Sequence, residues 1–171
     1  SIVLIIGVGI VQQQLDFVRN KALGFEKENL LVLPLSDQMY ENYNQIKPRL
    51  LKKPGINQIA IASRVPSGRL LDSQGGTVEI DGEMENISFR LADVHVGHDY
   101  LKTLNVSLVA GRDFDVNLAS DSSEAFIVNE AAIDRFGFQD PEQAIGKRMN
   151  YGGRDGRIIG VTKDFHFESL H

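Results

Sequence analysis

The stretch "AFIVNEAAIDRFGF", residues 125–138, decides the fold class because it contains a complete change from strand to helix. Its first five residues are mostly apolar, and β-branched and aromatic side chains of this kind are typical of a strand. Asn129 is then a favourable N-cap for a helix, and Gly137 is a favourable stop. Three apolar side chains between these two residues are expected to face inward: Ala132, Ile133 and Phe136. The stretch therefore predicts a domain that mixes sheet and helix.

Turn signals on both sides of this stretch predict β-hairpins. Asp81-Gly82 follows an alternating apolar pattern and is the strongest short hairpin signal in the chain. A second hairpin is expected about Gly152-Gly153, and it leads into the apolar run "RIIGV" at residues 157–161, which is typical of a buried strand. The middle of the chain is therefore expected to be rich in hairpins.

The first third of the chain predicts a strand, a helix and a second strand. "ENLLVLPL" at residues 28–35 is a short apolar run closed by a proline, as in a buried strand. Residues 38–55 have helical spacing, with an interruption at Pro48. "INQIAIASRV" at residues 56–65 alternates and predicts the next strand. This order suggests a β-α-β unit, and the whole chain is assigned to the α+β class.

The N-terminal segment "SIVLIIGVGIV", residues 1–11, contains no charge and is followed by three glutamines. It is shorter than the roughly 20 apolar residues of a complete membrane span, and it lacks the basic start of a secretory signal. A soluble helix that is apolar on every side fits only a buried position. Two interpretations remain: the outer half of a transmembrane helix, or a buried core helix.

An amphipathic pattern continues beyond the glutamines. Leu15, Val18 and Ala22 fall at helical spacing, and Gly24 is a helix stop. One helix is therefore expected to run from the apolar segment into water. Two basic residues just beyond the apolar run would, by the positive-inside tendency, favour the cytoplasmic side: Arg19 and Lys21.

Composition excludes several classes of function. The chain has 171 residues, of which 42% are hydrophobic and 24% charged, as in a folded globular protein. Its formal net charge is −5, and no basic cluster suggests a nucleic-acid partner. The absence of cysteine removes disulfides, thiol nucleophiles and cysteine metal sites.

Histidines and carboxylates provide the only candidates for chemistry. His95 and His98 lie near two aspartates, and His166 and His171 lie near Asp164 and Glu168. Either pair is compatible with metal binding or acid–base work. The simpler interpretation of the first pair is a helix start, where Asp99 suits the first turn.

An acidic loop and several glycines are further candidates for a site. Asp113, Asp115, Asp121 and Glu124 form a loop that could hold a cation weakly, but a solvated loop is favoured. The glycines match neither a dinucleotide loop nor a P-loop, and no serine occupies a nucleophile elbow. The sequence therefore predicts no catalytic residue, no cofactor and no metal.

Four phrases in order resemble one protein family. They are "QQQLDFVRNKALGFEKENLLVLPL" at 12–35, "HVGHDYLKTLNVSLVAGRDF" at 95–114, "AFIVNEAAIDRFGF…AIGKRM" at 125–149 and "IIGVTKDFHFESLH" at 158–171. Together they resemble the extracytoplasmic domain of MacB/FtsX-like ABC transporter permeases of the type common in Bacteroidetes. The resemblance covers essentially the whole chain.

This resemblance implies an organisation into three parts. Residues 1–24 would be the end of a transmembrane helix and its stalk. Residues 25–65 and 157–171 would form a first, porter-like subdomain, and residues 66–156 an inserted mixed α/β subdomain. The domain would lie in the periplasm, anchored in the inner membrane. Arg19 and Lys21 would then stand outside, so the topology rests on the resemblance.

The resemblance also implies a non-catalytic, mechanical function. A cytoplasmic ABC ATPase subunit would hydrolyse ATP, and the stalk helix would transmit the movement to the domain. The other implied partners are a second permease copy or half, and a periplasmic adaptor or cargo. The expected coupling residues lie on the stalk: Gln14, Leu15, Val18 and Ala22. Two alternatives remain: a free-standing, membrane-anchored periplasmic binding domain, and a small hydrolase that uses the histidines.

Overall fold

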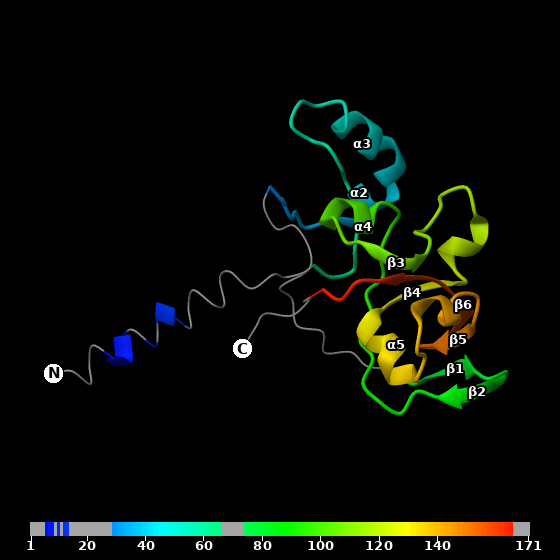
Figure 1. The fold of residues 1–171 in the computed structure, drawn as a ribbon. Helices are drawn as coiled ribbons and strands as arrows, with labels where there is room; N and C mark the ends of the chain where they lie inside the picture. Colours follow the sequence, from blue (N-terminus) through cyan, green and yellow to red (C-terminus); the bar gives the residue numbers. More distant parts are fainter. Residues whose placement is uncertain (1–5, 9, 11, 14–28, 66–73, 166–171) are drawn as a thin grey trace.

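The computed structural model describes residues 6–8, 10, 12–13, 29–65 and 74–165 (Figure 1). Its helices are α2 (Asp37–Glu41), α3 (Tyr43–Leu50), α4 (Tyr100–Leu104) and α5 (Glu130–Phe136), with 3₁₀ turns η1 (Ala119–Ser122) and η2 (Pro141–Ala144). Its strands are β1 (Gly76–Ile80), β2 (Glu83–Asn86), β3 (Leu108–Gly111), β4 (Ala125–Asn129), β5 (Arg148–Tyr151) and β6 (Arg154–Thr162).

These strands form one mixed sheet. Its order is β2-β1-β5-β6-β3, and β4 pairs with β6. The β4–β6 pair is parallel, whereas the other strand pairs are antiparallel. The combination of helices with a mixed sheet confirms the α+β class.

The strand-to-helix stretch folds as its sequence predicts. The Asn129 side chain accepts a hydrogen bond of 3.2 Å from the Ala132 backbone N–H, which caps α5. Gly137 ends the helix at φ 87°, in the left-handed region that favours glycine. Ile133 and Phe136 are buried, and they pack with Val78 and Ile158 of the sheet in the main core. The helix α5 therefore covers one face of the sheet.

Both predicted hairpins are confirmed. Asp81 and Gly82 connect β1 to β2 with φ values of 51° and 89°. Gly152 and Gly153 connect β5 to β6 with φ values of 60° and 76°. Positive φ at both central residues is the property of the type I′ turn, whose twist matches that of the flanking strands.

The predicted β-α-β unit near the start is wrong. Its helical part forms as α2 and α3, but residues 30–35 form no strand and residues 56–65 contribute only an isolated bridge, Ala62 to Val96. An apolar run forms a strand only where another strand pairs with it, and no described strand lies beside residues 30–35. The parallel strand pair that forms is β4 and β6, and the chain between them contains α5 and then β5.

The run "RIIGV" lies in the terminal strand β6, as predicted. Among the described residues, β6 pairs with β3, β4 and β5. The Gly152-Gly153 hairpin holds its first residues against β5. The expected boundary between residues 156 and 157 falls inside β6. The division into subdomains stays a prediction.

A second, smaller core cluster joins the early residues to α4. Tyr100 and Leu104 of α4 are buried, and Leu30 and Ala60 pack against this cluster. Lys47 of α3 adds an ion pair, with its Nζ 2.7 Å from Asp99 Oδ2. Residues 29–65 are therefore held on the sheet domain through α4.

Candidate functional site

The predicted stalk residues lie outside the described residues. These are Gln14, Leu15, Val18 and Ala22. Just before them, Ile6, Val8 and Ile10 are helical, with exposed fractions of 56%, 57% and 51%. These three apolar side chains do not enter the core, so the exposure argues against the buried-helix interpretation. Across the parts of the chain that the structure describes, no helix is both long and apolar enough to cross a membrane.

The histidines do not assemble a metal site in the described ranges. His95 Nε2 lies 3.2 Å from Asp93 Oδ2, and the two residues form an isolated pair. Asp99 is engaged by Lys47, whose hydrogen bond lowers the pKa of the Asp99 carboxyl. No group of three or more potential metal ligands occurs among the described residues. His166 and His171 lie outside them.

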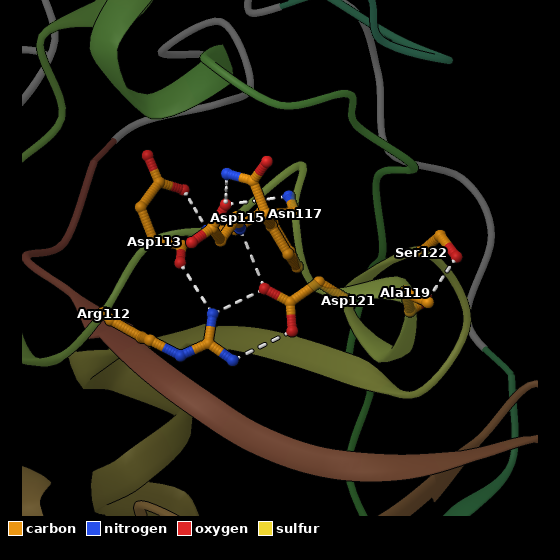
Figure 2. Close-up of polar contacts among 8 residues, drawn as sticks. Arg112, Asp113, Asp115, Asn117, Ala119, Asp121 and Ser122 are labelled. Carbon is orange, nitrogen blue, oxygen red and sulfur yellow. Dashed lines mark hydrogen bonds and ion pairs between the residues drawn. The ribbon is translucent and has the colours of Figure 1, made fainter.

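The acidic loop is largely exposed, as the sequence predicts, but one of its carboxylates, Asp121, is buried (Figure 2). Arg112 donates two hydrogen bonds to Asp121, Nη1 to Oδ2 at 2.5 Å and Nη2 to Oδ1 at 2.9 Å. The Asp115 backbone N–H donates a third, at 2.8 Å. The Asp121 side chain is only 1% exposed, and the hydrogen bonds from Arg112 hold its pKa at about 2.

Two further carboxylates of the loop, those of Asp113 and Asp115, accept hydrogen bonds from nearby residues of the same loop. Asp115 Oδ1 accepts hydrogen bonds from the backbone and side-chain N–H groups of Asn117, both at 2.9 Å. Asp113 Oδ1 accepts one from the Phe114 backbone N–H at 2.7 Å. N–H donors thus supply the contacts that a cation would otherwise provide. The loop begins directly after β3 and is closed by the Arg112–Asp121 ion pair, which we call the clasp.

Beside this clasp lies an open hollow of about 430 Å³. Its lining includes three arginines, Arg112, Arg148 and Arg157, and three acidic residues, Asp121, Glu124 and Asp155. Sequence reasoning missed this cluster because its members are far apart in the chain. A signal was present, since a two-residue turn at Gly152-Gly153 places Arg148 opposite Arg157.

An exposed apolar segment precedes α2. Leu31 and Leu33 are 78% and 66% exposed, and Val32 and Leu35 are exposed as well. The sequence predicts a buried strand at residues 28–35, so this exposure is a second correction to that prediction. Contiguous exposed apolar side chains are typical of contact surfaces.

Comparison with known proteins finds similarity to proteins named as permeases or transporters of the ABC type. No family model matches the chain. A segment of 68 residues, 40% of this chain, is 37% identical to the macrolide export ATP-binding/permease protein MacB of Rhodopseudomonas palustris (strain BisB18). The chain spans 10% of the length of that protein. Over these 68 residues, the match agrees with the resemblance that the sequence phrases carry.

Two solved structures show partial similarity to this chain. The periplasmic region of MacB from Actinobacillus actinomycetemcomitans is 17% identical with a TM-score of 0.47, and the match covers 80% of this chain and 54% of that one. The extracellular domain of the ABC-type transporter YknZ from Gram-positive bacteria is 21% identical with a TM-score of 0.47, over 78% of this chain and 66% of that one.

Proposed function

We propose that this chain is the extracytoplasmic domain of an ABC transporter permease and that it works without catalysis. The observation that carries the proposal is the 37% identity over 68 residues to a protein named as an ATP-binding permease. The engagement of Asp99 by Lys47 and of Asp121 by Arg112 adds support, since it gives these two carboxylates structural roles.

In this proposal the domain transmits movement. A separate cytoplasmic ATPase subunit hydrolyses ATP, and residues 1–24 carry the displacement across the inner membrane to the periplasm. The half-exposed Ile6, Val8 and Ile10 support this role, because three apolar side chains outside the core suit a hydrocarbon environment. The proposed coupling residues are Gln14, Leu15, Val18 and Ala22. A second permease copy and a periplasmic adaptor or cargo complete the set of partners.

A free-standing periplasmic domain with a membrane anchor is the second candidate. The same exposed apolar helix favours it, because an anchor needs the apolar segment but no ATPase. Further membrane spans in the parent reading frame, next to an ATPase gene, would exclude this candidate.

Cell fractionation with an antibody against this domain tests the proposal. We expect a band several-fold heavier than the 19.0 kDa of this chain, extracted only by detergent and cut by protease added to the periplasm. A water-soluble band near 19.0 kDa would contradict both the permease and the anchored domain. A detergent-extracted band of intermediate size would favour the anchored domain.

A further inference from the structure

Two arginines face each other across the β5–β6 hairpin. Arg148 and Arg157 are direct partners in the antiparallel register, and both line the hollow beside the Arg112–Asp121 clasp. Like charges directly opposite each other on a sheet are unfavourable. An anion that binds between the two guanidinium groups would offset this electrostatic repulsion.

The hydrogen-bonding capacity of this pair is largely unused. The Arg148 guanidinium makes no hydrogen bond or ion pair with any residue that the structure describes; the 3.2 Å bond to Glu79 Oε2 comes from its backbone N–H. Arg157 uses one donor, Nη1 to the Gly146 carbonyl oxygen at 2.7 Å. Arg112 differs, because its guanidinium is engaged by Asp121.

The other charges of the hollow indicate the kind of anion. Glu124 and Asp155 line the same hollow, and Asp155 Oδ1 accepts a hydrogen bond of 2.8 Å from Asn150 Nδ2. With three arginines against Asp121, Glu124 and Asp155, the lining is balanced in charge. Such a lining disfavours a doubly charged phosphate and an anionic membrane surface. It suits a single carboxylate, which matches the planar guanidinium fork.

We propose that Arg148 and Arg157 bind an acidic side chain of a protein partner that docks on this side of the β5–β6 hairpin. As the partner contact of a transporter domain, this inference rests on the function proposed above. It adds the chemistry of the contact: an aspartate or glutamate between the two guanidinium groups, with Glu124 available to a neighbouring basic residue.

Titration of the 171-residue chain with the peptide acetyl-Gly-Glu-Gly-Glu-Gly-amide, followed by NMR, tests the inference. We expect saturable shifts of the β5 and β6 amides, with a dissociation constant on the order of millimolar because exposed ion pairs are weak. Arg148→Gln and Arg157→Gln should each weaken binding about threefold, since each removes one exposed charge-assisted hydrogen bond. Arg49→Gln, on the exposed side of α3, is the matched control and should bind as the wild type does.

Three results would overturn the inference: no shifts at β5 and β6, equal binding of the glutamine version of the peptide, or tighter binding of inorganic phosphate than of the glutamate peptide. The last result would assign the hollow to a phosphate group instead. Circular dichroism confirms that each variant is folded. Failure here leaves the fractionation result intact, so the two proposals fail separately.

Discussion

Arg112 and Asp121 form a two-pronged ion pair that closes the loop between β3 and β4, with N–O distances of 2.5 and 2.9 Å. The two residues differ in burial, since the Asp121 side chain is 1% exposed and the Arg112 side chain is 44% exposed. The buried partner therefore depends on the exposed one for its neutralisation.

Arg112→Ala should destabilise the domain by about 1–3 kcal/mol, because it leaves the buried Asp121 carboxylate with fewer donors. The effect should fall below that of breaking a fully buried pair, since solvent reaches Arg112. Urea unfolding measures the change. Arg154→Ala is the control, because its contacts to the Ser122 and Ser123 carbonyls are long, at 3.4 Å. Equal losses in the two variants would contradict the role of the clasp.

The same pair should make stability depend on pH. The folded pKa of Asp121 is lowered from 3.8 to about 2, so the carboxylate stabilises the fold above its ordinary pKa. That contribution should disappear as the pH falls from 3.8 towards 2. The difference in unfolding free energy between the wild type and Asp121→Asn should therefore be largest near neutral pH and shrink in acid. A difference that stays constant from pH 7 to the acid limit would contradict the shifted pKa.

Gly82→Ala should destabilise the β1–β2 hairpin by about 1–2 kcal/mol, because φ of 89° places a Cβ in the left-handed region. Gly75→Ala is the matched control, since no atom lies within 4 Å of an added Cβ there and its φ is not positive. Thermal unfolding compares the two variants. An equal change in midpoint would show that the turn does not require glycine.

Leu31→Ser combined with Leu33→Ser should leave the unfolding free energy within about 0.5 kcal/mol of the wild type, because both side chains are exposed. It should shorten the retention of the folded chain on a hydrophobic-interaction column, because the exposed apolar area decreases. Leu104→Ser, in the second core cluster, should instead destabilise strongly. Unfolding of the double variant would show that the segment is covered.

The features that the sequence predicts well are encoded by neighbouring residues. The Asn129 cap and the Asp81-Gly82 turn each need only a few adjacent positions, and both form as predicted. The prediction of a buried strand at residues 28–35 was wrong. A strand needs a pairing strand from elsewhere in the chain, and the local sequence pattern carries no information about one. The burial of Asp121 was not predicted either, because it depends on Arg112, which is nine residues away and comes close only when the loop folds.

The nine residues of β6 give the domain a mechanical anchor. This strand is bonded in parallel to β4 and antiparallel to β3 and β5, so its last residues are held on both edges. A pull along the chain beyond Thr162 loads these hydrogen bonds in shear, and several must break together. A pull on β2, which is held along one edge, would instead peel its bonds in succession. Tension that enters at the end of β6 is therefore borne by its pairings with both β3 and β4.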